Sequence, residues 1–224
     1  MQAIVLCGGL GTRLREITKG IPKPMALINS KPFLEYILKY LKSQGITSVV
    51  LGVSYRYEMI CEYFGDNFLD LEILYSIEKE PLGTGGAIRE SLKLARESLV
   101  YVLNGDTYFD INLKSLELEK ESKICLGLKK MQDFDRYGCV EIDKQGFIEA
   151  FKEKEFRKEG LINGGIYLTG KDLFDGFTLE EKFSFESFLQ SHFVGLKASG
   201  KVFEDYFIDI GIPQDYLRAQ EEME

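Results

Sequence analysis

Histidine, cysteine and long apolar runs are scarce in this chain of 224 residues. The single histidine, His192, sits in an amphipathic pattern beside Phe188 and Phe193, where we expect a structural role. The sequence therefore offers no Ser-His-Asp or Cys-His arrangement for nucleophilic catalysis. The four cysteines are widely scattered and form no C-x-x-C pair, so we expect reduced thiols rather than a disulfide framework.

Membrane binding and nucleic-acid binding are disfavoured by other absences. No apolar run approaches the roughly 18 residues that suggest a membrane span, and the sequence starts with an apolar strand rather than a signal peptide. A net charge of −8 argues against non-specific binding of nucleic acid. We therefore expect a cytoplasmic protein that binds neither membranes nor nucleic acid. An anionic small substrate is still compatible, because Mg²⁺ and local cations can reverse the field in a cleft.

The first half of the chain alternates apolar strands with amphipathic helices. Strands are expected over 3–7, 49–53, 71–77 and 99–103. Helices are expected from an N-cap at Ser30 to an end at Gly45, over 56–64, and from Gly83 to about Ser98. This pattern predicts an α/β fold, with a Rossmann-like, mixed and mainly parallel sheet that has helices on both faces. Ligands in such folds bind beyond the carboxyl ends of the strands.

The second half changes character and predicts a small β-hairpin elaboration. Two strand-like segments, 139–142 and 147–151, flank a Lys-Gln-Gly turn. Further strands are expected over 161–168 and 201–210, and helices over 184–193 and 213–222. We predict a single domain over 1–224, in which the second half builds the other wall of a cleft.

A glycine-rich loop after the first strand is the most informative feature of the chain. This loop and the segment after it contain Gly8, Gly9, Gly11, Thr12, Arg13 and Lys23. Glycines let backbone N–H groups approach an anion, an arginine grips phosphate oxygens in pairs, and a lysine adds a point charge. The loop lacks both the P-loop pattern and the third glycine of G-x-G-x-x-G. It therefore indicates a polyphosphate site of another kind.

Two aspartates are candidate metal ligands. Asp106 follows an apolar strand in N-G-D, and Asp209 interrupts an apolar run in D-I-G-I-P. A buried carboxylate is costly unless it is paired or metal-bound, and Mg²⁺ prefers one or two carboxylates with phosphate oxygens and water. Asp106 alone is equally compatible with a turn or a helix N-cap. Sequence spacing does not establish that the two aspartates meet.

These segments resemble the signatures of the sugar-1-phosphate nucleotidyltransferases. G-G-L-G-T-R-L and P-K-P resemble the N-terminal signature of that family, and N-G-D and D-I-G-I-P resemble its two metal-ligand motifs. L-G-T-G-G-A resembles a loop that lies against the nucleobase and ribose. Y-G-C-V, E-K and N-G-G-I-Y resemble segments that contact the sugar 1-phosphate. The proline of the family's E-K-P and the alanine of its N-A-G are replaced here, which leaves the charged residues intact.

The resemblance implies a nucleotide-diphospho-sugar transferase-like fold and a Mg²⁺-dependent reaction of an NTP with a sugar 1-phosphate, giving an NDP-sugar and pyrophosphate. Residues 1–110 would mainly bind nucleotide and 111–224 sugar phosphate. The catalytic residues it implies are Arg13, Lys23 and Asp106, with Mg²⁺ on Asp106 and Asp209. The nucleotide contacts it implies are Leu6, Gly8, Gly9, Gly11, Thr12, Gly83, Thr84 and Gly85. The sugar-phosphate contacts are Gly138, Glu153, Lys154 and Asn163.

Glu80 is the residue-level clue to the nucleobase. A carboxylate only accepts hydrogen bonds, and guanine presents adjacent N1–H and N2–H₂ donors, so Glu80 favours GTP; a solvated loop glutamate is the alternative. The short form resembles most closely the bacterial D-glycero-α-D-manno-heptose 1-phosphate guanylyltransferases, which make GDP-heptose for surface polysaccharide. The alternatives are a mannose-1-phosphate guanylyltransferase, a glucose- or N-acetylmuramate-1-phosphate thymidylyl- or uridylyltransferase, and an inactive regulatory subunit. A homodimer is compatible with each.

Overall fold

The structure is a computed structural model that describes residues 1–9, 20–119 and 121–223. Gly11, Thr12 and Arg13 of the predicted site lie outside the described residues. The centre of the main sheet is formed by four parallel strands in the order β7 (Leu99–Asn104), β1 (Gln2–Leu6), β4 (Ser48–Val53) and β6 (Leu71–Ile77). Their register places Leu6 beside Asn104 where both strands end. The predicted parallel core is confirmed.

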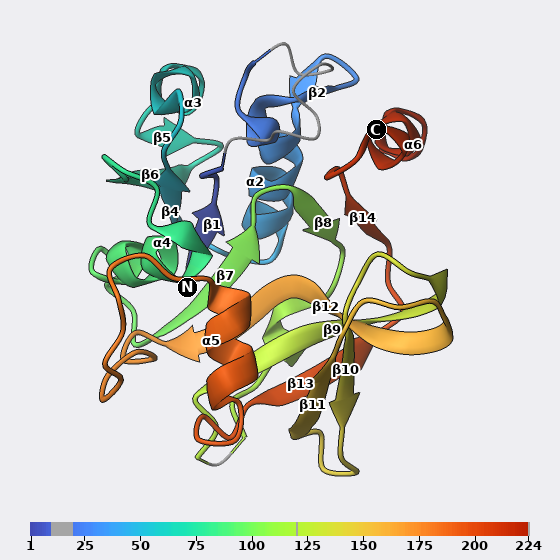
Figure 1. Ribbon diagram of the computed structural model, residues 1–224. Coiled ribbons are helices and arrows are strands. Elements are labelled where there is room, and N and C mark those ends of the chain that lie inside the picture. Colours follow the sequence, from blue (N-terminus) through green and yellow to red (C-terminus); the bar gives the residue numbers. More distant parts are fainter. Residues whose placement is uncertain (10–19, 120, 224) are drawn as a thin grey trace.

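Antiparallel strands extend this sheet on one side (Figure 1). β12 (Arg157–Gly170) pairs with β7 through its second half and with β9 (Ile124–Phe134) along most of its length. The predicted hairpin is present as β10 (Cys139–Ile142) and β11 (Ile148–Lys152). β13 (Ser199–Phe203) runs parallel to β9, and the short β5 (Asn67–Phe68) forms the other edge beside β6. The long strand β9 is absent from the sequence prediction.

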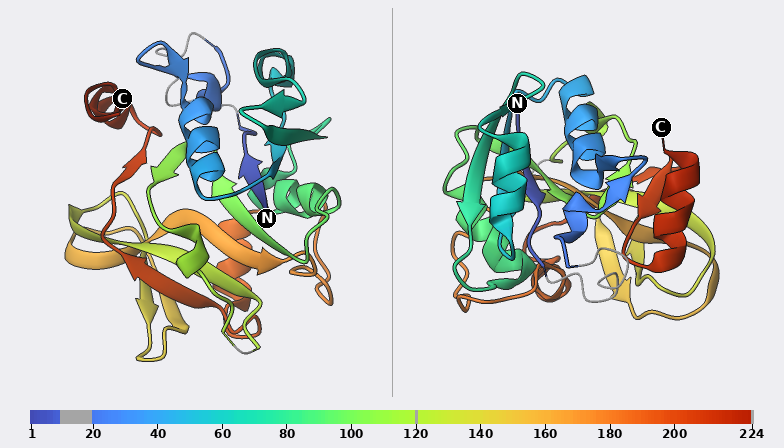
Figure 2. Two further views of the ribbon diagram at one scale, coloured as in Figure 1. Left: turned by 180° about the vertical axis from the view of Figure 1, so that it is seen from behind. Right: turned by 90° about the horizontal axis from the view of Figure 1, so that it is seen from above.

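Helices cover both faces of the sheet, as predicted. Side chains of β1 alternate between two cores, because Ala3 and Val5 face one and Ile4 faces the other. The first core includes α2 (Phe33–Ser43) and α3 (Tyr57–Phe64), and the second includes α4 (Gly83–Leu92) and α5 (Phe185–His192). Figure 2 shows α6 (Pro213–Glu222) in red beside the segment of β2 (Leu27–Ile28) and β3 (Lys31–Pro32). The Tyr216 hydroxyl on α6 donates to the Leu27 carbonyl over 2.7 Å.

Three predicted boundaries are wrong for local reasons. Ser30 lies in the turn between β2 and β3 with φ of 69°, and Pro32 rather than Ser30 precedes α2. Helix α4 ends at Leu92 instead of reaching Ser98. The expected strand 201–210 is split into β13 and β14 (Phe207–Asp209), because the chain turns at 204–206, where Lys129 Nζ donates to two carbonyls. The second piece, β14, pairs with β8 (Thr107–Phe109) as a separate ladder.

The scarce residues have the structural roles expected of them. His192 Nδ1 donates to the Phe188 carbonyl over 2.9 Å, and its ring stacks on Phe188. All four cysteines are unpaired; Cys61 is half-buried and the others are buried. Among the helices of the described residues, none combines the length and the apolar character that crossing a lipid bilayer requires.

Candidate functional site

Lys23 and Asp106 form an ion pair at the carboxyl ends of the central strands. Lys23 begins the 3-10 helix η2 (Lys23–Met25) between two prolines, and its Nζ lies 2.7 Å from Asp106 Oδ2. Just before Asp106, the Gly105 N–H donates to the Leu6 carbonyl over 3.0 Å. A Cβ on Gly105 would lie 2.5 Å from that carbonyl oxygen, so the close approach of the two strand ends requires glycine. Two residues predicted as catalytic are thus in direct contact.

Asp209 supplies a second carboxylate beside Asp106. In the ladder of β8 and β14, Asp209 pairs with Thr107, and the Ile210 N–H donates to the Asp106 carbonyl over 3.0 Å. Burial and the negative charge of Asp106 raise the pKa of Asp209. The Gly211 N–H, which donates to Asp209 Oδ1 over 2.7 Å, lowers this pKa in part. The topology therefore joins the two aspartates that sequence spacing left unconnected, and two carboxylates that share one lysine suit a divalent cation.

A cavity lies beyond the end of β1 and is called here the Glu78 cavity. Gly8, Gly9, Tyr55, Glu78 and Thr84 are among its lining residues. The two glycines follow β1, and Thr84 lies in the first turn of α4. Leu6, Pro81 and Ala87 add apolar surface and Ser54 adds a hydroxyl group, so the cavity suits a mainly apolar ring that meets one carboxylate.

Glu78, rather than the predicted Glu80, contributes that carboxylate. Glu78 follows β6, and its Oε2 accepts a 2.8 Å hydrogen bond from the Leu82 N–H. Its Oε1 lies 3.0 Å from where a Cβ on Gly8 would stand. Burial raises the pKa of Glu78, and the Leu82 N–H acts in the opposite direction. Glu80 is exposed and is not among the described residues that line this cavity, so its contact with the nucleobase stays a prediction while Glu78 is the carboxylate at the cavity.

The second glycine-rich loop, at 83–86, is built to receive the segment before α5. The Gly85 N–H donates to the Phe183 carbonyl over 3.0 Å, and Thr84 Oγ1 accepts from the Phe185 N–H over 2.9 Å. A Cβ on Gly83 would lie 2.5 Å from the Phe183 carbonyl oxygen, and one on Gly85 would overlap the Phe183 ring. Gly83 and Thr84 line the Glu78 cavity, whereas Gly85 is buried outside it. Gly85 therefore has a packing role, and the contact of its main chain with the nucleoside stays a prediction.

We expect Gly85→Ala to lower the free energy of unfolding by about 1–3 kcal/mol, because the added methyl group must displace the Phe183 ring. Urea denaturation of the purified variant measures this change. Gly195→Ala is the matched control, since a Cβ there would meet only the His192 carbonyl at 3.7 Å. Equal stability of the two variants would contradict the packing role of Gly85.

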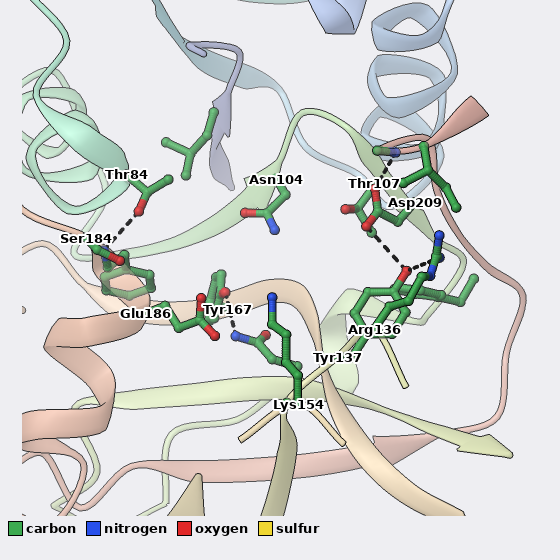
Figure 3. A pocket seen from close by; sticks show the side chains of 17 residues that line it. Thr84, Asn104, Thr107, Arg136, Tyr137, Lys154, Tyr167, Ser184, Glu186 and Asp209 are labelled. Carbon is green, nitrogen blue, oxygen red and sulfur yellow. Dashed lines mark hydrogen bonds between the residues drawn. The ribbon is translucent and has the colours of Figure 1, made fainter. Parts of the chain in front are cut away.

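A second cavity, called here the Lys154 cavity, lies between the central sheet, β12 and α5 (Figure 3). Gly138, Lys154 and Asn163, which were predicted to contact sugar phosphate, all line it. Figure 3 shows the side chain of Lys154 projecting into the cavity between Glu186 and Asp209. The structure thus gathers most of the predicted sugar-phosphate residues around one space.

Asn163 is held firmly at the wall of the Lys154 cavity. Its Oδ1 accepts from the Gly165 N–H over 3.0 Å, and its Nδ2 donates to the Tyr167 hydroxyl over 2.8 Å. Gly165 has φ of 74°, and a Cβ there would lie 2.6 Å from Asn104 Nδ2. The N-G-G sequence therefore forms a strand irregularity in which Gly165 packs closely against Asn104 at the end of β7.

Glu186 lines the Lys154 cavity, as Asp209 does, whereas Glu153 does not. Glu153 is exposed and does not belong to the described lining, and its contact with the sugar stays a prediction. Glu186 lies in the first turn of α5, after the N-cap Ser184, and lines the cavity. In the sequence, an acidic residue after an N-cap serine is typical of helix capping, so no signal marked Glu186 as functional.

Lys23 and Asp106 lie between these two cavities. They line a third space together with Gly8, Gly9 and Thr84, which also border the Glu78 cavity. Asn104 borders both this third space and the Lys154 cavity. The three spaces therefore share walls, and the cation and the two carboxylates stand where ligands from both sides meet. Such an arrangement can align two anionic reactants and neutralise charge between them.

The chain is similar in sequence and in fold to known proteins. A model of the family described as nucleotidyl transferase matches residues 2–224. The chain is 65% identical to a D-glycero-alpha-D-manno-heptose 1-phosphate guanylyltransferase of Campylobacter jejuni, over 96% of this chain and 97% of that protein. It is 47% identical to the protein of the same name from Aneurinibacillus thermoaerophilus, over 100% and 99%. HddC from Yersinia pseudotuberculosis, solved in complex with GMP-PN, aligns with a TM-score of 0.85 at 35% identity, covering 100% of this chain and 99% of that one.

Proposed function

This chain belongs to the nucleotidyl transferase family, and from that premise we propose that it transfers GMP from GTP to D-glycero-α-D-manno-heptose 1-phosphate, releasing pyrophosphate. The full-length similarity to two heptose 1-phosphate guanylyltransferases supports both substrates. The observation that carries the proposal is the placement of Lys23, Asp106 and Asp209 between the Glu78 and Lys154 cavities. In an inactive regulatory subunit, we would expect the loss of at least one of these three charged residues.

The reaction asks the protein for alignment and charge neutralisation. A phosphate oxygen of the sugar 1-phosphate attacks the α-phosphorus of GTP in line, and the bond from that phosphorus to the pyrophosphate oxygen breaks. The attacking oxygen is already ionised, so no general base is needed. Lys154 holds the acceptor phosphate from its cavity, and Lys23 neutralises charge where the two phosphates meet. Arg13, which the family resemblance assigns to the triphosphate, lies outside the described residues.

We propose that Asp106 and Asp209 hold Mg²⁺. Their proximity and the raised pKa of Asp209, caused by burial and by the charge of Asp106, support a cation between them. When bound, Mg²⁺ would offset negative charge on the phosphates. Within the described residues, no group of three or more His, Cys, Asp and Glu side chains forms a candidate metal site. Two carboxylates with phosphate oxygens and water are a usual Mg²⁺ environment.

Glu78 is the residue that favours GTP. Its carboxylate can accept from the adjacent N1–H and N2–H₂ groups of guanine, whereas uracil and thymine offer one N–H between two acceptors. Glu186 and Asn163 are the groups of the Lys154 cavity that could bind sugar hydroxyls. We also propose a cytoplasmic location, which four unpaired cysteines favour, and a supply of GDP-heptose for surface polysaccharide. The homodimer stays a prediction.

The KM for GTP should depend on pH through Glu78. Burial raises the pKa of this carboxyl, so it is protonated at a higher pH than an ordinary glutamate and then loses acceptor capacity. We expect the KM for GTP to be lowest near neutral pH and to rise as the pH falls through that raised pKa. Steady-state kinetics between about pH 8 and about pH 5 measure the profile. In Glu78→Gln, the same limb should be flat; an unchanged limb would assign it to another group.

The deciding experiment is pyrophosphate release with Mg²⁺ across a substrate matrix. GTP, UTP, dTTP, CTP and ATP are each paired with the 1-phosphates of manno-heptose, mannose, glucose and N-acetylmuramate. We expect turnover with GTP and the heptose phosphate. A higher kcat/KM for mannose 1-phosphate than for the heptose phosphate would change the assigned acceptor and leave the assignment of GTP unchanged. Turnover confined to UTP or dTTP would overturn the assignment of GTP, and turnover with no pair would overturn the proposed function.

A further inference from the structure

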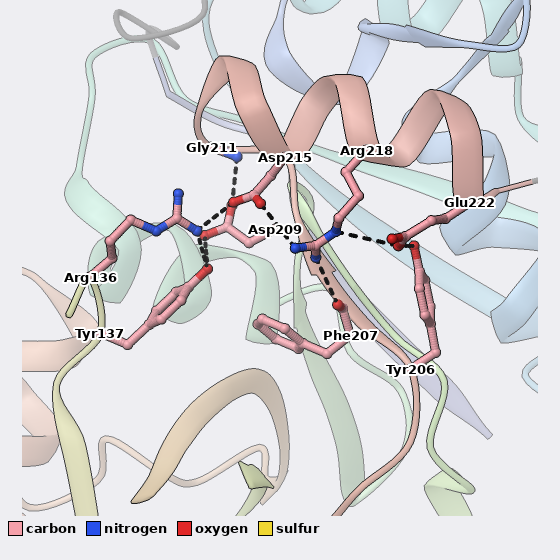
Figure 4. Close-up of polar contacts among 9 residues, drawn as sticks. All are labelled: Arg136, Tyr137, Tyr206, Phe207, Asp209, Gly211, Asp215, Arg218 and Glu222. Atoms are coloured by element: carbon pink, nitrogen blue, oxygen red, sulfur yellow. Dashed lines mark hydrogen bonds and ion pairs between the residues drawn. The ribbon is translucent and has the colours of Figure 1, made fainter. Parts of the chain in front are cut away.

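Asp215 is a buried carboxylate that the proposed reaction does not use. It lies in the first turn of α6 and is 8% exposed. Its Oδ2 forms an ion pair with the Arg136 guanidinium, and its Oδ1 lies 3.3 Å from Arg218 Nη1 (Figure 4). A carboxylate between two guanidinium groups is well compensated. Arg218 also pairs with Glu222 on the side away from Arg136.

Arg136 connects Asp215 to the aspartate pair of the site. Its Nη2 donates to the Tyr137 hydroxyl over 3.1 Å, and its guanidinium carbon lies 5.4 Å from the centre of the Tyr137 ring. The Tyr137 hydroxyl in turn donates to Asp209 Oδ2 over 3.3 Å. Both Arg136 and Tyr137 line the Lys154 cavity with Asp209. The contacts therefore run without interruption from Asp215 to Asp209.

This chain of contacts restricts the side chain of Asp209 from one side. The Gly211 N–H fixes Oδ1, and the Tyr137 hydroxyl approaches Oδ2. Arg136 holds Tyr137 in that orientation, because its guanidinium donates to the Tyr137 hydroxyl and lies over the Tyr137 ring. Arg136 is itself fixed by its ion pair with the buried Asp215. A planar guanidinium fork suits this bridging role better than the single ammonium group of lysine.

We propose that Asp215, Arg136 and Tyr137 are positioning residues that orient Asp209 toward a divalent cation. The proposal rests on the proposed function, since it takes Asp209 as a metal ligand. Outer partners of this kind contribute to metal affinity without contacting the metal. Asp215 also lies where the dipole of α6 favours a negative charge, so a purely structural role is the alternative that the experiment must separate.

The experiment compares four variants of the full chain: Asp215→Asn, Tyr137→Phe, their combination, and Arg136→Lys. The first readout is Mn²⁺ binding to the protein alone, from the electron paramagnetic resonance signal of free Mn²⁺. The second is the KM for Mg²⁺ set against the KM for GTP. Glu222→Gln is the matched control, because it removes the same charge from α6 and contacts Arg218 and Tyr206 instead of Arg136.

We expect each single variant to weaken Mn²⁺ binding about tenfold and to raise the KM for Mg²⁺ with little change for GTP. The double variant should bind Mn²⁺ no more weakly than each single variant, because both substitutions interrupt the same chain of contacts. Glu222→Gln should bind Mn²⁺ like the wild type. Unchanged Mn²⁺ affinity in Asp215→Asn, additive losses in the double variant, or an equal loss in Glu222→Gln would each overturn the proposal.

The chain of contacts from Asp215 through Arg136 and Tyr137 to Asp209 is called here the relay. An experiment that contradicts the relay gives a different result from one that contradicts the proposed function. A wild-type protein that binds Mn²⁺, loses affinity in the relay variants and turns over no pair of the substrate matrix keeps the relay and overturns the function. A protein that turns over GTP and heptose phosphate while the relay variants bind Mn²⁺ normally keeps the function and overturns the relay. A wild type that binds no Mn²⁺ also overturns the relay.

Discussion

Asp106→Asn should lower kcat by about 10³-fold while the protein stays folded. The substitution keeps the shape of the side chain and removes the charge that Lys23 contacts at 2.7 Å and that lies beside Asp209. Because the Lys23–Asp106 pair is partly solvent-exposed, we expect the free energy of unfolding to change by less than about 1 kcal/mol. Pyrophosphate release under saturating substrates and a urea titration measure the two effects.

Asp110→Asn is the control for this prediction. Asp110 follows β8, is exposed and belongs to none of the described cavity linings around Asp106. The Asp110→Asn substitution makes the same chemical change four residues away and should leave kcat unaltered. If Asp106→Asn retained more than about a tenth of the wild-type kcat, a metal-ligand role for Asp106 would be untenable.

Glu78→Gln should lower kcat/KM for GTP by about 10²-fold, mainly through KM. An amide turns one acceptor into a donor, which then faces an N–H group of guanine inside a partly buried cavity. The loss should be much smaller for UTP and dTTP, whose bases offer acceptors on both sides of one N–H. Competition between GTP and UTP for the same enzyme measures the change in preference directly.

Glu80→Gln separates the structural assignment from the sequence-based one. Glu80 is exposed, whereas Glu78 lines the cavity and accepts from the Leu82 N–H. We expect Glu80→Gln to keep the wild-type preference for GTP. A loss of preference in Glu80→Gln with none in Glu78→Gln would reverse the assignment.

The fold was predictable where local pattern and tertiary structure agree. Apolar runs such as 99–103 are strands because parallel strands are buried on both faces, and the residues at their ends reach one edge of the sheet. This rule was enough to place Gly8, Thr84 and Asp106 around a common cleft. The long strand β9 was missed because its first part is apolar and its second part is rich in charged and polar residues.

Parts of the site could not be predicted, because they depend on contacts between distant segments. The pairing of β14 with β8, which joins Asp209 to Asp106, has no signature in either strand. Which of Glu78 and Glu80 lines the cavity depends on the direction of a loop, because the two residues differ by two positions in the same polar segment. Gly85 matched a nucleotide-binding motif, yet its missing side chain makes room for Phe183.

The pairing of β14 with β8 also has a consequence for the order in which the enzyme matures. The Glu78 cavity is built from residues in the first half of the chain, and β14 is the last strand in chain order. Asp209 is synthesised roughly 100 residues after Asp106, which at typical elongation rates is a delay of roughly 5–20 s. During that interval the nascent chain lacks one carboxylate of the aspartate pair, and for most of it also lacks the segment at 183–185 that packs on the second glycine-rich loop. The site that joins both aspartates can therefore form only after nearly the whole chain has been synthesised.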